Sequence, residues 1–412
     1  MRKFFSKSGV RYYLFIILFL IFLFLSNDFG ATDVQKTAIV VAAGIDRQED
    51  TFILTTQIAI PQSSKQGKST EVVQIVSRGK TVGEAFDEIN AKTGWYPKLV
   101  FCNLILLGES AKTANVFEAL DFFLRDEYLS DNCLVAVCAG TSKDLLNATA
   151  LIDASSSTAM KKVLSSHAER VGTVLPNTLR EFSIGYFSDS KSGYLPILTT
   201  EPQQEKVGKN DTNQPSTQNN TTGESTSQNT TKSENSASGN KASEDKPVFS
   251  ARETALFVHG KWVDTLTSNE TFALASVLSK LRLASYTLES DRACTLSIRR
   301  NTPSIKLQEN NGVFTLKVKV DCTAGLLDYA KAQPIKETAD AGDTPKEFFN
   351  LAANKLSGEI ERVFEKCRTV NCDLFGVRER LIKYNKRHLR TQENAVLKDT
   401  RVQVSVHFKN VR

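Results

Sequence analysis

The first thirty residues constrain this chain most, because a basic segment runs directly into an uninterrupted apolar one. The basic side chains are Arg2, Lys3, Lys7 and Arg11. The apolar run extends from Tyr12 to Leu25, and Ser26 ends it. This order is typical of an export signal that leaves its basic end in the cytoplasm. We therefore expect the chain after about residue 30 to lie outside the cytoplasm.

Residues 1–31 are interpreted as a signal anchor, with a cleaved signal peptide as the alternative. The candidate cleavage site, Phe29-Gly30-Ala31, places a bulky Phe where a small residue is preferred. A lipoprotein would carry a Cys just after the apolar run, whereas the first Cys of this chain is Cys102. A protein anchor is thus favoured over a lipid.

Composition and charge limit the classes of function. The chain has 412 residues, 41% of them hydrophobic, which is enough for two or three domains with their own cores. Its net charge of +6 is not concentrated in a basic stripe interleaved with aromatic residues. A nucleic-acid partner is therefore not expected.

Seven cysteines lie mostly within apolar, strand-like runs, and there is no C-x-x-C motif. They are Cys102, Cys133, Cys138, Cys294, Cys322, Cys367 and Cys372. We interpret them as small buried hydrophobic residues. Cys133 and Cys138 are five residues apart, so in one strand they would face opposite sides. A disulfide between Cys367 and Cys372, near a helix end, is the alternative for that pair.

Strand and helix patterns alternate over 34–140, which predicts a first α/β domain. Strands are expected at 36–45, 52–60, 72–77, 99–107 and 132–138, with helices starting at Thr81 and near residue 113. Residues 141–200 predict a smaller, more helical second lobe.

Residues 201–248 contain almost no apolar side chain, so we expect a disordered polar linker. Residues 249–412 predict a C-terminal α+β domain. It begins with a hairpin around His259-Gly260-Lys261, followed by a helix to about 281. Strands are expected at 293–299, 304–308, 314–322 and 402–408, a helix opening with Pro345 at its first position, and a helix at 374–389. The overall prediction is an α+β chain in which a membrane anchor precedes three mixed α/β domains.

No enzyme signature is found. The histidines His167, His259, His388 and His407 are far apart and lack metal-ligand spacing. Nucleophile-elbow, zinc-protease, phosphate-loop and dinucleotide-binding motifs are all missing from the sequence. Asp46 follows a strand and is interpreted as a turn residue. We therefore predict no catalytic, cofactor-binding or metal site, and no enzyme activity.

The order of several segments resembles the C subunit of bacterial spore germinant receptors, the Ger(x)C family. These segments are Ala38-Ile-Val-Val-Ala-Ala-Gly-Ile-Asp46, Gly79-Lys80-Thr81, Leu104-Ile-Leu-Leu-Gly-Glu109, Leu120-Asp-Phe-Phe-Leu-Arg-Asp126, Leu195-Pro196, the hairpin 254–264 and Asp373-Leu-Phe-Gly376. The resemblance lies in their order and spacing over nearly the whole exported part. This chain departs from the family in lacking the lipidation Cys.

The resemblance implies a non-catalytic, outward-facing protein of the spore inner membrane, with a cytoplasmic N-terminus. It also implies three α/β domains and A- and B-type partner subunits. The whole complex would sense a small-molecule germinant in nutrient-triggered spore germination. An extracytoplasmic solute-binding or wall-contacting envelope protein is the alternative, and an extracytoplasmic hydrolase is the third hypothesis.

Overall fold

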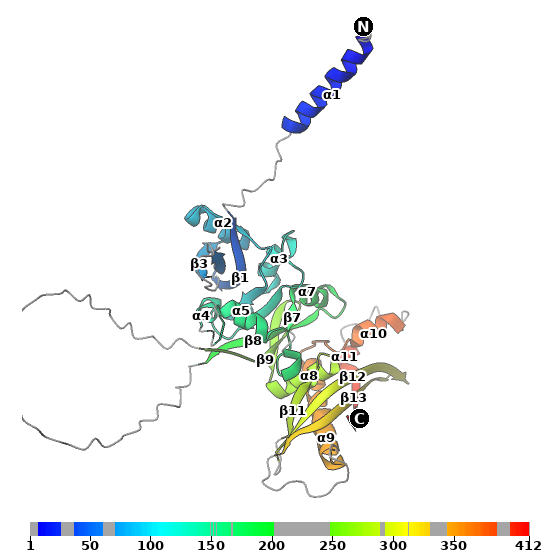
Figure 1. Cartoon of the computed structure of the whole chain (residues 1–412). Helices are drawn as coiled ribbons and strands as arrows, with labels where there is room; N and C mark the ends of the chain where they lie inside the picture. Colours follow the sequence, from blue (N-terminus) through cyan, green and yellow to red (C-terminus); the bar gives the residue numbers. More distant parts are fainter. Residues whose placement is uncertain are drawn as a thin grey trace, which may run out of the picture.

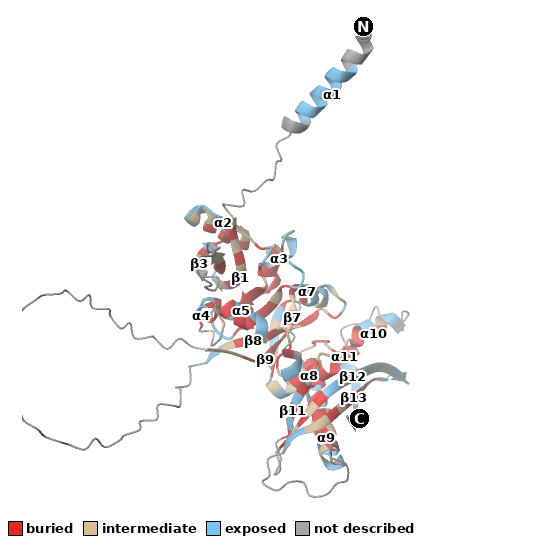
Figure 2. Cartoon of the chain, in the orientation of Figure 1, coloured by how far each residue is buried: buried red, intermediate tan, exposed pale blue. Residues whose placement is uncertain are grey.

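The computed structural model describes most of the chain as two β-sheets with packed helices (Figure 1). The described residues are 7–25, 37–60, 71–148, 150, 152–153, 155–165, 168–201, 248–288, 293–311, 313–329, 344–384 and 396–411. Buried residues concentrate where helices meet the sheets (Figure 2). The chain therefore has a mixed α/β fold.

The N-terminal apolar run forms a helix, α1 (Lys7–Leu25). Its described side chains, residues 12–22, are all exposed. Within the part of the chain that the structure describes, no helix has both the length and the apolar character needed to cross a membrane.

The first sheet has the strand order β10-β9-β8-β6-β5-β1-β2-β3, with β4 beside β1 and β7 beside β6. Its strands are β1 (Thr37–Gln48), β2 (Thr51–Ile60), β3 (Glu71–Gly79), β4 (Tyr96–Lys98), β5 (Leu104–Leu107), β6 (Leu134–Cys138), β7 (Asn177–Thr178), β8 (Ser192–Glu201), β9 (Val248–Val258) and β10 (Lys261–Leu266). The central strands β1, β5, β6 and β8 run parallel, whereas the outer strands pair antiparallel.

Helices cover both faces of this sheet. They are α2 (Val82–Thr93), the 3-10 turn η2 (Glu109–Lys112), α3 (Phe117–Arg125), α4 (Ser142–Asn147), α5 (Ser156–Val163), α6 (Ala168–Val171) and α7 (Leu179–Phe187). Ile105 and Leu107 pack with α2, α3 and α7, whereas Leu104 and Leu106 pack with α4 and α5. Burial on both sides explains why β5 is apolar at every position.

Local signals place α2 where the sequence predicts it. The Thr81 side chain caps the helix by accepting from the backbone N–H of Glu84 at 3.1 Å. The Glu84 carboxylate then accepts from the backbone N–H of Lys80 at 2.6 Å, one residue before the position a capping box uses. Gly94 ends the helix in the left-handed region, at φ 72°.

The second sheet has the order β11-β12-β13-β14. Its strands are β11 (Ala284–Leu288), β12 (Cys294–Asn310), β13 (Val313–Tyr329) and β14 (Arg401–Asn410). The helices of this half are α8 (Ser268–Val277), α9 (Lys346–Thr369), α10 (Val377–Tyr384) and α11 (Val396–Asp399). The apolar faces of α8 and α9 pack on one side of the sheet.

Two local predictions for this half need correction. The separate strands at 293–299 and 304–308 are one strand, β12, in which Pro303 pairs with Val320. Because β11 pairs only with residues 294–298, Pro303 lies where β12 is an edge strand, a position in which proline is tolerated. Pro345 is the N-cap of α9, and the helix begins at Lys346.

The hairpin at His259-Gly260 is confirmed, but it belongs to the first sheet. His259 and Gly260 have φ of 50° and 72°, as a tight hairpin turn with two left-handed residues requires. β9 pairs with β8 along its length, from Ser192↔Val258 to Glu201↔Val248. Residues 248–266 therefore share a sheet with the N-terminal half. The linker assigned to 201–248 lies, apart from its two ends, outside the described residues, and the domain boundaries stay a prediction.

The seven cysteines are buried, as the sequence predicts, and all seven are free thiols in this structure. Cys133 packs on one face of the first sheet and Cys138 on the other. Cys367 and Cys372 meet where α9 ends, because Asn371 adopts φ 60° and the Cys372 N–H donates to the Cys367 carbonyl at 2.8 Å. This is the helix-ending motif in which apolar residues at those two positions touch.

Glu270 joins α8 to α9 and should make stability depend on pH. Burial disfavours its charged form, but hydrogen bonds from the Thr267 backbone N–H and the Lys366 ammonium outweigh burial and lower its pKa. A lowered pKa stabilises the fold above the unfolded-state value, and this stability is lost as the pH falls through the folded-state pKa. Glu270→Gln should therefore cost about 1 kcal/mol at pH 7 and less at acidic pH. Urea denaturation at pH 7 and below pH 4.5 measures the difference; an equal loss at both pH values would contradict it.

Candidate functional site

The second sheet presents an open face opposite its core. Along β13 the side chains of Leu316, Val318 and Val320 are buried against the helices. The alternating residues point to the other side, where none of the described helices covers the sheet. The sheet thus has one packed face and one solvated face.

Strand register arranges the open face in five rows across β12, β13 and β14. From one end to the other, the rows are Gln308–Thr315–Arg401, Lys306–Lys317–Gln403, Ser304–Lys319–Ser405, Thr302–Asp321–His407 and Arg300–Thr323–Lys409. We call these residues the basic face. It has no apolar side chain in these rows, and its single carboxylate there is Asp321.

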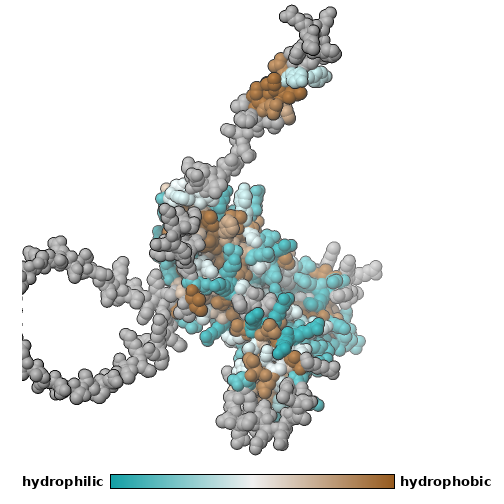
Figure 3. Space-filling view, in the orientation of Figure 1, coloured by the Kyte–Doolittle hydropathy of each residue, from teal (hydrophilic) through white to brown (hydrophobic). Residues whose placement is uncertain are grey.

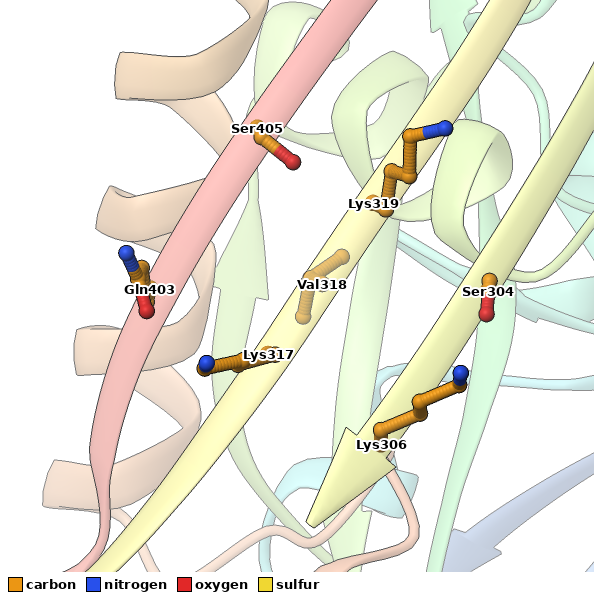
Figure 4. Close-up of a pocket in the computed structure, with 7 residues that line it drawn as sticks. All are labelled: Ser304, Lys306, Lys317, Val318, Lys319, Gln403 and Ser405. Atoms are coloured by element: carbon orange, nitrogen blue, oxygen red, sulfur yellow. The ribbon is translucent and has the colours of Figure 1, made fainter. Parts of the chain in front are cut away.

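The positive charge is concentrated at the middle of the basic face. Lys306 lies directly opposite Lys317, and Lys319 follows on the same side of β13. Directly opposed like charges in a sheet are unfavourable for folding. A groove runs over this place, lined by Ser304, Lys306, Lys317, Val318, Lys319, Gln403 and Ser405 (Figure 4). The figure shows these side chains distributed over the three neighbouring strands β12, β13 and β14.

Asp321 only partly offsets this charge. The Lys319 ammonium donates to its carboxylate at 2.8 Å and, with further nearby cations, lowers the pKa of Asp321. His407 Nδ1 lies 3.8 Å from the other carboxylate oxygen. The carboxylate is thus engaged by neighbours on the face. The arrangement suits electrostatic attraction to an acidic surface.

The Asp373-Leu-Phe-Gly376 segment has a structural position, at a buried junction between the two halves. The Asp373 carboxylate accepts from the backbone N–H groups of Val377 and Arg378, at 2.8 and 2.7 Å, and thereby caps α10. The Asp373 N–H donates to Ser192 Oγ at 2.9 Å. Arg378 reaches the same loop, because its guanidinium donates to the Ser190 carbonyl at 3.1 Å.

The residues singled out for chemistry do not come together. Asp46 accepts from the backbone N–H and the hydroxyl of Ser142, at 3.0 and 2.6 Å, so it links β1 to the start of α4. His259 lies in the hairpin turn and His407 on the basic face, while His167 and His388 lie outside the described residues. Within the described ranges, no group of three or more His, Cys, Asp or Glu side chains could hold a metal ion.

The basic face is not among the features predicted from the sequence. Its signal is the alternation of polar residues, most of them Lys or Arg, with apolar residues at 304–307, 316–320 and 401–404. That pattern indicates which side of each strand is solvated, but not that the three strands are neighbours. Their pairing places residues almost a hundred positions apart in one row, such as Lys306 and Gln403 on either side of Lys317.

Comparisons with known proteins identify both halves of the chain. Residues 30–200 match the family model described as spore germination protein N-terminal domain, and residues 252–412 match the model described as spore germination B3/GerAC like, C-terminal. Spore germination protein B3 of Bacillus subtilis (strain 168) is 29% identical over 137 residues, covering 32% of this chain and 36% of that protein. Spore germination protein A3 of the same organism is 27% identical over 140 residues, covering 32% and 37%.

These alignments span little more than a third of either relative. A solved structure extends the comparison at the level of the fold. The crystal structure of the GerBC protein superposes with a TM-score of 0.50 and 15% identity, over 90% of this chain and 97% of that one.

Proposed function

Because this chain belongs to the family of spore germination proteins that the two models describe, we propose that it is the C subunit of a spore germinant receptor. In this role it acts without catalysis, beside A- and B-type membrane subunits, in nutrient-triggered germination. The observation that carries the proposal is the match of both family models, in order, to residues 30–200 and 252–412.

The proposed location is the outer side of the spore inner membrane, with the N-terminus in the cytoplasm. The basic head and the apolar run to Leu25 support a tether within residues 1–31. A helix that spans the membrane holds a protein more firmly than a single acyl chain does. Three mixed α/β domains, 34–140, 141–200 and 249–412, would follow this tether outside the membrane.

The basic face gives the proposed subunit a surface for its partners. Lys306, Lys317 and Lys319 lie close together there, and repulsion between them lowers the stability of the fold. A role in binding would explain why the chain carries these charges at this place. Charge of one sign on an open sheet face favours association with a surface of the opposite sign. We propose an acidic region of a partner subunit as that surface.

Deleting the gene tests the function itself. Spores without this chain should lose their response to at least one amino acid or sugar, because the receptor would lack a subunit. Release of dipicolinic acid after nutrient addition measures the response, and a nutrient-independent trigger serves as the control. Restoring the full chain should restore germination. A deletion strain that answers every nutrient at the wild-type rate would contradict the proposal.

A further inference from the structure

The edge of the first sheet where β1, β5 and β6 begin carries exposed aromatic side chains. β4 pairs in parallel with the start of β1, with Tyr96 beside Thr37. The turn before β5 holds Phe101, and the segment before β6 holds Tyr128. Since parallel strands begin at the same edge, these residues gather there. We call Trp95, Tyr96, Val100, Phe101 and Tyr128 the aromatic patch.

The aromatic patch is unusually exposed for apolar residues. Trp95 is 43% exposed, Tyr96 53%, and Phe101 and Tyr128 57% each. An apolar groove adjoins it, lined in part by Ile58, Val73, Ile75 and Trp95. Figure 3 shows hydrophobic side chains gathered on the upper part of the body, over the first sheet. A contiguous exposed patch of this kind marks a site of interaction.

The chemistry of the aromatic patch fits a bilayer surface. Trp and Tyr combine an apolar ring with a polar tip, and they concentrate where lipid headgroups meet hydrocarbon. The Lys98 ammonium lies 4.8 Å from the centre of the Tyr128 ring, so a cation stands among the aromatic side chains. A lysine beside aromatic side chains in the headgroup region can extend its ammonium to the lipid phosphates.

The N-terminal helix leads to the aromatic patch. Only residues 26–36 separate the end of α1 at Leu25 from the start of β1 at Thr37. A fully extended chain of that length spans about 40 Å at most. β1 starts beside Tyr96 and Pro97, so the tether enters the body at the aromatic patch. From this continuity we propose that the aromatic patch docks into the headgroup region of the membrane that holds the tether. The inference rests on the membrane tether of the proposed function.

Trp95 provides a native reporter, because the chain has two tryptophans. The other, Trp262, donates from its ring nitrogen to the Asp264 carbonyl at 2.9 Å, in the β9–β10 hairpin. The Lys112 ammonium lies 5.5 Å from the Trp262 ring and belongs to η2, which follows the far end of β5. Trp262 lies on β10, the strand at the end of the sheet, which β9, β8, β6 and β5 separate from β1 and β4.

The test uses the full chain in vesicles of phosphatidylcholine and phosphatidylglycerol, with or without bromine on the acyl chains. In Trp262→Phe, brominated lipid should quench the remaining Trp95 by about twofold and its emission should lie at shorter wavelength. In Trp95→Phe, Trp262 should be unaffected. Adding Phe101→Ser and Tyr128→Ser to Trp262→Phe should weaken the quenching, whereas Ile184→Ser, exposed on α7, should not.

Flotation of the same vesicles separates the possible failures. If the chain floats but Trp95 is quenched no more than Trp262, docking of the aromatic patch is wrong while the tether stands. If the chain does not float, both are wrong. Shielding of Trp95 that requires added partner subunits would assign the patch to a protein and overturn the lipid proposal. The germination phenotype of the deletion strain tests the receptor function independently of these outcomes.

Discussion

Asp373→Ala is expected to destabilise the fold by about 3–5 kcal/mol, because it removes a buried carboxylate from a hydrogen-bonded junction. Asp373 is 3% exposed, and Arg378 beside it is 6% exposed. Without the carboxylate, the backbone N–H groups of Val377 and Arg378 at the start of α10 lose their acceptor inside a buried junction. The contact from α10 to the loop before β8 should weaken as a consequence.

A matched control separates burial from capping. Asp126 also accepts from two backbone N–H groups, those of Tyr128 and Leu129, both at 2.9 Å, but in a solvent-accessible loop. Asp126→Ala should cost only about 1 kcal/mol. Urea unfolding of both variants of the full chain, followed by circular dichroism in the same detergent, gives the comparison. Equal losses would mean that the junction between the halves contributes little.

Reversing charge on the basic face should weaken partner binding by at least about tenfold, which corresponds to about 1.4 kcal/mol. The variant is Lys306→Glu with Lys317→Glu and Lys319→Glu, and all three side chains point to solvent. The fold should tolerate these changes because the core face of β13 is untouched. The amount of partner subunit recovered with tagged chain from spore membranes measures the effect, and raised salt should reduce recovery with the wild-type chain.

The single change Lys306→Glu separates an effect on partner binding from an effect on fold stability. It replaces a like-charged cross-strand pair with an attractive one opposite Lys317, so stability should rise by about 0.2–1 kcal/mol. Partner recovery should nevertheless fall. Lys143→Glu, at an exposed position of α4, is the control that changes charge away from the face. If Lys306→Glu and Lys143→Glu retain partners equally well, the basic face is not the docking surface.

Local patterns predict most of the elements in this fold, because their causes are local. The apolar spacing that begins at Val82, the Thr81 cap and the Gly94 end are enough to define α2. The left-handed turn at His259-Gly260 likewise follows from the residues themselves. The burial of Cys102, Cys133 and Cys138 is likewise predictable, because each lies within an apolar run.

The arrangement of those elements depends on contacts that the sequence does not reveal. The hairpin of β9 and β10 joins the first sheet through β8, across residues 202–247, and nothing in the hairpin itself selects that partner. The Asp373 N–H meets Ser192 across 181 positions. The basic face required the pairing of β13 with β14. These are choices among sheets and neighbours, which hydrophobic periodicity leaves open.

We propose that this chain works as an interaction subunit of a germinant receptor. Affinity purification of the tagged full chain from spore membranes, followed by mass spectrometry, tests it most directly. We expect A- and B-type receptor subunits to be recovered with the wild-type chain and to be depleted with the triple lysine reversal. Recovery of the chain without either subunit, from spores shown to contain both, would contradict it.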